Sequence, residues 1–164
     1  MGLVAQQLLR MAGGTCSGGT FTRPRLSPWI HSPARPLVLR QFKSIASAEA
    51  MELLKTGWEF LDIRRSEEGQ AYGVVAVPSG SSYHLVTSHV LGPRGMMFDS
   101  EAWLEEVESK LPDKEAKIVI GCAGGVRSKA AARVLEAAGY VNVQELDDGF
   151  NGWAASGFPV APLK

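Results

Sequence analysis

The stretch KIVIGCAGGVRS at residues 117–128 carries the strongest structural signal in the chain. Lys117–Gly121 is apolar on both faces, which is typical of a strand in a parallel sheet covered by helices. Cys122 follows this strand directly. A helix rich in alanine is predicted from Ser128 to Ala138, with Gly139 as its C-terminal stop. The stretch therefore predicts a buried strand, a short glycine-containing loop and a helix.

Apolar runs and capping signals predict further elements on either side of this stretch. Strands are expected at 58–63, 74–77 and 141–146, and helices at 47–55, from 99 or 100 to 111, and at 149–155. Ser47 is expected to cap the first of these helices. Ser79–Phe98 is expected to be a long loop, functional or mobile. The alternation of strands and helices predicts an α/β domain with a mainly parallel central sheet and helices on both faces.

The loop after the central strand has the residues of an anion-binding site. In an open α/β sheet, ligands bind beyond the carboxyl ends of the strands, where Cys122 is expected. Gly124 and Gly125 allow the backbone to curl so that its N–H groups face inward, and the start of the next helix adds its positive end. Arg127 supplies a full charge and a planar set of donors. Such a cradle would stabilise both a thiolate and an anionic substrate.

A thiolate in an anion cradle suits attack on sulfane sulfur, or attack on phosphorus or arsenic. The loop from Cys122 to Arg127 spans six residues, and a phosphate dianion needs a wider cradle than a persulfide does. Arsenate reductase or phosphatase chemistry is therefore disfavoured. A non-catalytic binding or regulatory module, which binds a partner through Ser79–Phe98, is a further alternative, and the presence of Cys122 favours the enzyme over it.

Four segments resemble the rhodanese family: FLDIR at 60–64, CAGGVRS at 122–128, GYVNV at 139–143, and the glycine, tryptophan and GFP pattern of 149–159. The resemblance covers nearly all of 47–160 and is closest in style to the single-domain rhodaneses of plants and algae. It implies a rhodanese-like fold and a sulfurtransferase. Cys122 would take sulfane sulfur from a small anionic donor such as thiosulfate. The resulting enzyme persulfide would pass its outer sulfur to cyanide, a thiol or a protein acceptor.

The same resemblance implies roles for individual residues of the site. The loop amides would hold the persulfide, and they belong to Ala123, Gly124, Gly125, Val126 and Arg127. Arg127 would also orient the anionic donor, and Ser128 is expected to support the loop. Asp62 and Arg64, at the end of a predicted strand, are expected to pair with each other and to cap neighbouring loops.

Neither a metal ion nor an organic cofactor is predicted. His84 and His89 are separated by a spacing that matches no standard metal site, and no other Cys or His lies nearby in the sequence. Both are expected to be solvated loop histidines.

Residues 1–47 have the composition of a targeting leader. They contain no acidic residue, several spaced arginines, and four prolines that forbid a continuous helix. Such a segment buries too little apolar surface to fold alone, so it is predicted to be a disordered organelle transit peptide ahead of a domain at 48–164. Its mature end is expected between about Arg40 and Ser47. The chloroplast is slightly favoured over the mitochondrion.

The remainder of the chain is acidic, which disfavours sequence-independent binding to nucleic acid because that requires clustered Lys and Arg. No apolar run approaches the roughly 18 residues that a membrane span needs. The expected partners are therefore a sulfur-containing anion and a thiol or cyanide acceptor, with no nucleic acid and no membrane.

Overall fold

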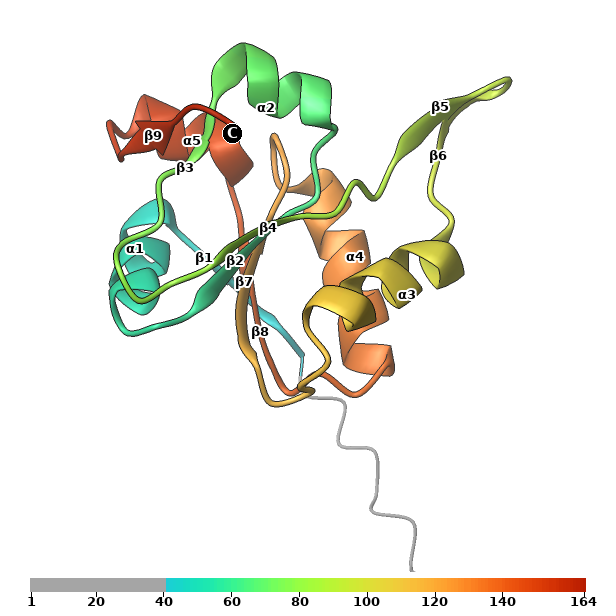
Figure 1. Cartoon of the computed structure of the whole chain (residues 1–164), viewed down its shortest axis with the longest axis horizontal. Helices are drawn as coiled ribbons and strands as arrows, with labels where there is room; N and C mark the ends of the chain where they lie inside the picture. Colours follow the sequence, from blue (N-terminus) through green and yellow to red (C-terminus); the bar gives the residue numbers. More distant parts are fainter. Residues whose placement is uncertain (1–40) are drawn as a thin grey trace, which may run out of the picture. The chain divides into compact units, whose positions relative to one another are not determined.

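A computed structural model describes residues 41–164 (Figure 1). The central sheet has five strands in the order β1-β8-β7-β2-β4. These strands are β1 (Lys43–Ile45), β8 (Asn142–Leu146), β7 (Lys117–Gly121), β2 (Glu59–Asp62) and β4 (Tyr83–Leu85). Every neighbouring pair is parallel, so all five carboxyl ends lie at one edge of the sheet. The predicted parallel α/β architecture is confirmed.

Helices cover both faces of this sheet, as Figure 1 shows. Helices α1 (Ser47–Lys55) and α5 (Gly149–Ala155) pack on one face, and α3 (Ser100–Lys110) and α4 (Val126–Ala137) pack on the other. Each face has its own apolar cluster. Phe60 of β2 points into the cluster of α1 and α5, whereas its neighbour Leu61 points into the cluster of α3 and α4.

The starts of the helices show which capping signals were decisive. Of the two residues expected at the start of this helix, Asp99 and Ser100, the cap of α3 is Asp99, because its Oδ1 accepts the N–H groups of Glu101 and Ala102 at 3.2 and 3.1 Å. The predicted cap at Ser47 is wrong, since Ser47 is already the first helical residue of α1 and is buried. Helix α4 begins at Val126, two residues before the predicted start at Ser128, because the chain enters the helix directly after a left-handed turn at Gly125.

Two predictions between β2 and β4 need correction. The apolar run expected as a strand at 74–77 forms only β3 (Val74–Val75), which pairs antiparallel with β9 (Val160–Ala161) outside the central sheet. Helix α2 (Ser66–Tyr72) was not predicted, because Gly69 lies in its middle and glycine has a low helix propensity. The Arg65 N–H donates to the Glu68 carboxylate at 3.0 Å and so closes the first turn of α2.

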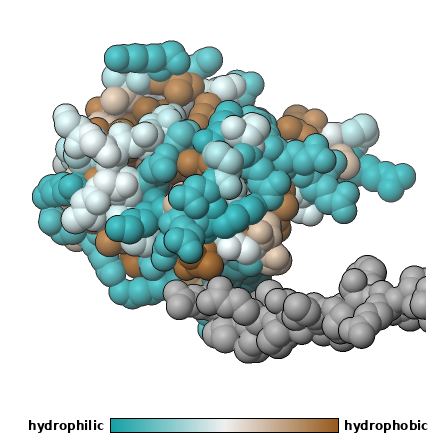
Figure 2. Space-filling model, turned by 60° about the horizontal axis from the view of Figure 1, so that its bottom comes forward, coloured by the Kyte–Doolittle hydropathy of each residue, from teal (hydrophilic) through white to brown (hydrophobic). Residues whose placement is uncertain are grey.

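The predicted loop at 79–98 contains regular structure. Besides β4, it includes a hairpin of β5 (Val90–Gly92) and β6 (Gly95–Met97) that projects from the body of the domain (Figure 1). Its four large apolar side chains are about half exposed or more, and Leu91 reaches 73%. Figure 2 shows hydrophobic side chains on the projection at the right of an otherwise mainly hydrophilic face.

Strand β1 lies within the segment that the sequence assigns to the leader. It pairs with β8 from Lys43 to Ile45, so the folded part of the chain begins before residue 47. Residues 1–40 lie outside the described residues, and the transit peptide stays a prediction. Among the helices of residues 41–164, none is both long enough and apolar enough to cross a membrane.

Candidate active site

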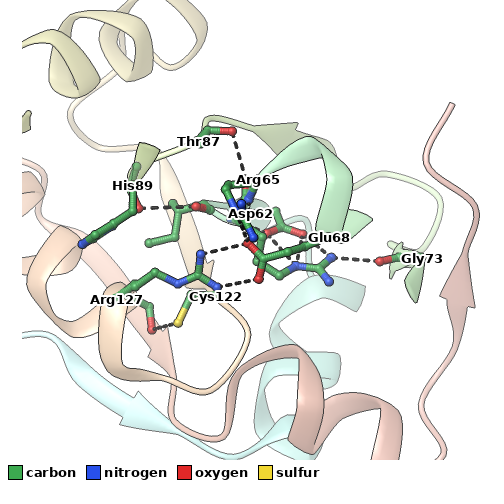
Figure 3. Close-up of polar contacts among 12 residues, drawn as sticks. Asp62, Arg65, Glu68, Gly73, Thr87, His89, Cys122 and Arg127 are labelled. Carbon is green, nitrogen blue, oxygen red and sulfur yellow. Dashed lines mark hydrogen bonds and ion pairs between the residues drawn. The ribbon is translucent and has the colours of Figure 1, made fainter. Parts of the chain in front are cut away.

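Cys122 occupies the carboxyl end of β7, which is the middle strand of the sheet, and is only 1% exposed. The loop that follows connects β7 to α4 (Figure 3). The Cys122 Sγ lies 3.5 Å from the Ser128 Oγ, in the first turn of that helix. The structure therefore places the predicted cysteine where the fold gathers its loops, in direct contact with one predicted supporting residue.

Two glycines fix the path of the loop. Gly125 has a φ of 80°, and a Cβ atom there would overlap the carbonyl oxygen of Asp147. Gly149 has a φ of 59°, and a Cβ atom there would approach the carbonyl oxygens of Cys122 and Ala123 to 2.5 and 2.6 Å. No other residue fits either position without a shift of the backbone.

Backbone N–H groups in the first turn of α5 donate hydrogen bonds to the loop. The Phe150 N–H donates to the Cys122 carbonyl at 2.7 Å, and the Asn151 N–H donates to the Ala123 carbonyl at 2.9 Å. These two bonds use carbonyl groups of the loop and none of its N–H groups.

The backbone N–H groups of residues 123–128 donate to no acceptor within residues 41–164. Consecutive free N–H groups at the start of a helix form a binding site for an anion. The expected bonds from these amides to the Cys122 sulfur itself are not formed within the same residues, where the hydrogen-bond partner of Sγ is Ser128. The amides are thus available to a charged group beyond Sγ.

Arg127 is held by a residue that the sequence did not reveal. Its Nη1 and Nη2 donate to the two carboxylate oxygens of Glu68 at 2.9 and 2.8 Å, a bidentate pair that links α4 to α2 (Figure 3). The hydrogen bond from Arg127 lowers the pKa of Glu68 to about 2. The pKa of Arg127 is raised, first by Glu68 and further by Cys122. The predicted cation therefore lies beside the cysteine, with its donor fork occupied by Glu68.

Asp62 and Arg64 form the predicted pair and are both buried. The Arg64 Nη2 donates to the Asp62 Oδ2 at 2.7 Å and to the Gly73 carbonyl, at the end of α2, at 2.9 Å. Its guanidinium carbon also lies 3.9 Å from the ring centroid of Phe150 in α5. The pair thus joins β2 to the two helices that frame the loop, which is a structural role.

A family model for the rhodanese-like domain matches residues 46–156. The chain belongs to the rhodanese-like domain family. It is 33% identical over 122 residues to thiosulfate sulfurtransferase 18 of Arabidopsis thaliana, covering 71% of this chain and 82% of that protein. It is 32% identical over 119 residues to the chloroplastic thiosulfate sulfurtransferase 16 of the same plant, covering 71% and 90% of the two chains.

A solved structure supports the fold of the rhodanese domain. The polysulfide-sulfur transferase of Wolinella succinogenes superposes with a TM-score of 0.57 over 76% of this chain and 81% of that one, at 20% sequence identity. At that identity the similarity shows the fold alone. The resemblance drawn from the sequence motifs is confirmed.

Behind the loop, the rhodanese domain buries a carboxylate that the sequence analysis missed. Ser128 is fully buried, and its Oγ donates to the Glu145 Oε1 at 2.6 Å and lies 3.0 Å from the Gly125 carbonyl. Glu145 is also fully buried, in β8. Its burial could have been predicted from the sequence, because Glu145 lies two residues after the buried Val143 and alternate residues of a strand share a face.

The prediction of two solvated loop histidines is wrong for His84 and holds in part for His89, which lies in the loop between β4 and β5 but is partly buried. His84 belongs to β4, and its Nε2 lies 2.7 Å from the Glu59 Oε2 on the adjacent strand. His89 stacks on Phe98 with 4.9 Å between ring centroids, and burial, with a smaller effect of Arg127, lowers its pKa. Within residues 41–164, no group of three or more His, Cys, Asp or Glu side chains could hold a metal ion.

Proposed function

We propose that this rhodanese-domain protein is a sulfurtransferase that carries sulfane sulfur on Cys122. The observation that carries the proposal is the position of Cys122 beside the guanidinium of Arg127 and the N–H groups of 123–128, which donate to no acceptor in the described part of the chain. The family relationship and the two relatives named as thiosulfate sulfurtransferases support it.

In the first half-reaction, the thiolate of Cys122 attacks the outer sulfur of a donor such as thiosulfate. A bond forms between Sγ and that sulfur, the sulfur–sulfur bond of the donor breaks, and sulfite leaves with the electron pair. The product is a persulfide whose outer sulfur carries the negative charge. Free backbone N–H groups are suited to hold this charge, because they provide partial positive charge without a counter-ion.

In the second half-reaction, cyanide or a thiolate attacks the outer sulfur of the persulfide. The bond to Sγ breaks, and Cys122 leaves as a thiolate with the electron pair. The product is thiocyanate or a hydropersulfide, and a cysteine on a protein could serve as the acceptor by the same chemistry.

Glu68 limits what Arg127 can do for the donor. With a pKa of about 2, Glu68 is ionised at neutral pH and occupies both arms of the guanidinium at 2.8 and 2.9 Å. An anionic donor must therefore compete with Glu68 or be recognised mainly by the backbone N–H groups. We infer that the amides carry most of the recognition and that Arg127 contributes positive potential from the side.

The proposed cellular location is the plastid. The acid-free, arginine-containing leader at 1–47 supports import into an organelle, and the name of one relative marks that protein as chloroplastic. The test is the amino-terminal sequence of the protein from purified chloroplasts. An end between about Arg40 and Ser47 is expected, and an intact Met1 would contradict cleavage.

The test of the chemistry is the substitution Cys122→Ser. Treatment with thiosulfate should add the mass of one sulfur atom to the wild-type protein, on the peptide that contains Cys122, and nothing to the variant. Thiocyanate formation from thiosulfate and cyanide should fall to the background rate, while the circular dichroism spectrum stays that of the wild type. Equal turnover by the serine variant would show that Cys122 does not carry the sulfur.

A further inference from the structure

Glu145 is an unusual group for the middle of a parallel sheet. Glu145 is 0% exposed, yet within residues 41–164 the hydrogen bonds to its carboxylate come from two hydroxyl groups. Ser128 donates to Oε1 at 2.6 Å, and Ser44 of β1 donates to Oε2 at 2.7 Å. A buried charge is costly unless it is paired or hydrogen-bonded, so these two bonds are what allow Glu145 to remain there.

The cations on either side of Ser128 in the sequence form ion pairs with other carboxylates. Lys129, which follows Ser128 in α4, donates to the Asp147 Oδ1 at 2.6 Å. Arg127, which precedes it, is taken by Glu68. Within residues 41–164, Glu145 makes no ion pair. Lys129 lies close enough to Glu145 to feel its charge, but the ion pair of Lys129 is formed with Asp147 at the surface.

The single hydrogen of the Ser128 hydroxyl decides how Glu145 acts on the sulfur. Two acceptors lie within reach of Oγ, the Glu145 carboxylate at 2.6 Å and the Gly125 carbonyl at 3.0 Å. The carboxylate is the closer acceptor, and it forms the stronger bond when it is ionised. Once the hydrogen points to Glu145, Oγ has only lone pairs to offer Cys122 Sγ at 3.5 Å. The contact is then a hydrogen bond donated by the S–H group.

We propose that Glu145 is a positioning residue that, through Ser128, holds the resting Cys122 in its thiol form. Contacts of 3.5 and 2.6 Å share the Ser128 Oγ, so Sγ and the Glu145 Oε1 are at most about 6 Å apart. Ionised Glu145 therefore opposes a second negative charge on the sulfur. Formation of the thiolate therefore requires a group nearby that can accept the proton of the Cys122 thiol.

The same three groups offer the proton a route. The S–H bond breaks with its electron pair left on Sγ, Oγ accepts this proton, and Oγ passes its own hydrogen to the Glu145 Oε1. The thiolate forms as Glu145 becomes neutral, so the buried charge stays at one throughout. No electron is transferred and no further reactant is needed.

Other charged groups around the sulfur do not replace this effect. On the side of α2, Arg127 favours the thiolate, but Glu68 binds it in a bidentate pair. His89, on the segment after β4, lies close enough to Arg127 for its pKa to be lowered by it. A neutral imidazole there adds no charge of its own.

On the side of α4 and the turn before α5, the charged groups are Lys129, Asp147 and Asp148. Lys129 and Asp147 pair with each other at the surface, with side chains 43% and 51% exposed. The hydrogen bond to Asp147 raises the pKa of Lys129 most, and the charges of Glu145 and Asp148 raise it further. Exposed charges such as these are screened by solvent and salt. Glu145 is thus a buried carboxylate that makes no ion pair within residues 41–164 and is linked to the sulfur through a single shared hydroxyl.

The test is the pH dependence of alkylation of Cys122 by iodoacetamide. The full chain is used with Cys16→Ser, so that Cys122 is the single cysteine. In Glu145→Gln, the pH at which the rate is half-maximal should fall by about one to two pH units, or about ten- to a hundredfold in rate on the acidic side, for a lost charge roughly 6 Å away at an effective dielectric constant near 20. An unchanged or higher midpoint overturns the proposal.

A matched control and a second variant make the outcome specific. Glu106→Gln removes an exposed carboxylate from α3 and should leave the midpoint in place. The difference between wild type and Glu145→Gln should persist at 1 M salt, because buried charges are screened little. If Glu145→Gln does not fold, the same alkylation measurement on Ser128→Ala tests the proposal. Its midpoint should also fall, because the thiol loses its acceptor, whereas a rise would show that Ser128 donates to the sulfur.

The effect of Glu145 on the thiol of Cys122 rests on the proposed function only where it bears on sulfur transfer. Alkylation needs no donor and no acceptor, so the two can fail separately. A lowered midpoint in Glu145→Gln together with no sulfur loading on Cys122 would refute the sulfurtransferase and leave the coupling in place. Sulfur loading on Cys122 with an unchanged midpoint would support the sulfurtransferase and refute the coupling to Glu145.

Discussion

Replacement of Gly125 by alanine tests whether the backbone path of the loop makes Cys122 competent. Gly125 adopts a φ of 80°, where an alanine side chain is strained, and the added Cβ would overlap the Asp147 carbonyl oxygen. The same Cβ would lie 2.9 Å from the Asp147 carbonyl carbon, so both obstacles are backbone atoms. Neither can be relieved by the rotation of a side chain, and the loop or the turn before α5 must move.

The magnitude follows from these two effects. The left-handed conformation alone costs alanine about 1 kcal/mol, and the overlap raises the expected loss of folding free energy to about 2–4 kcal/mol. Relief of the overlap requires a shift of about 1 Å. A misplacement of that size at a reacting centre lowers the rate on the order of 100-fold. We therefore expect a folded but weakened protein with about 1% of the thiocyanate-forming activity.

Gly157→Ala provides the matched control. Gly157 has a φ of 74°, but a Cβ atom there would meet nothing within 4 Å, so this variant carries the conformational cost without the overlap. It should lose about 1 kcal/mol and keep its rate. Urea unfolding and thiocyanate formation measured on both variants separate the two effects. If Gly125→Ala is as stable and as active as Gly157→Ala, the loop shifts freely and the positioning argument is wrong.

Two further substitutions test the ion pairs around the loop. Because Arg127 lowers the pKa of Glu68 to about 2, the carboxylate stabilises the fold fully above about pH 4.5 and progressively less as the pH falls toward 2. Glu68→Gln should therefore lower the free energy of unfolding by at most about 3 kcal/mol at pH 7 and by almost nothing near pH 2. An equal loss at both pH values, measured by urea titration, would refute this. Asp62→Asn leaves Arg64 buried without its partner and should cost about 3–5 kcal/mol in thermal or urea unfolding. Glu52→Gln in the exposed pair with Lys55 should cost at most about 0.5 kcal/mol, and a comparable loss in both variants would contradict the role of burial.

The elements that the sequence predicts well are those whose signal is local and strong. Lys117–Gly121 alternates between the two apolar clusters, with Ile118 and Ile120 on one face and Val119 on the other, so a run of apolar residues was sufficient to identify β7. Helix α3 begins where Asp99 supplies its side-chain cap. In both cases the residues that determine the element lie within it or directly beside it.

The elements that the sequence did not predict depend on partners elsewhere in the chain. Strand β4 has three residues, all only partly buried, and it exists because β2 offers it a parallel ladder. Strand β1 is equally short, and its pairing with β8 places it in the sheet although its composition matches the leader. A strand of three residues is too short for its pattern to be distinguished from a loop.

The site divides in the same way. Cys122, Arg127 and Ser128 belong to one continuous loop and could be identified together. Glu68 lies 59 residues before Arg127, and Glu145 lies 17 residues after Ser128. Each makes its contact because the parallel sheet brings the carboxyl ends of distant strands to one edge. Sequence alone could indicate the nucleophile and its loop, and the carboxylates that modulate them required the tertiary structure.

The charges around Cys122 explain why the conformation of the loop, set by Gly125, is important for the site. Glu68 pairs with Arg127 beside the sulfur, and Glu145 is linked to the sulfur through Ser128, so ionised Glu145 and the paired Arg127 together favour a neutral sulfur. The opposing effect must come from the backbone N–H groups of 123–128, whose partial charges neither titrate nor form ion pairs. Their arrangement depends on the left-handed turn at Gly125. The negative charge of a persulfide would thus be stabilised by the shape of the loop, and for this reason a methyl group at Gly125 is expected to be more damaging to activity than the loss of an exposed charge.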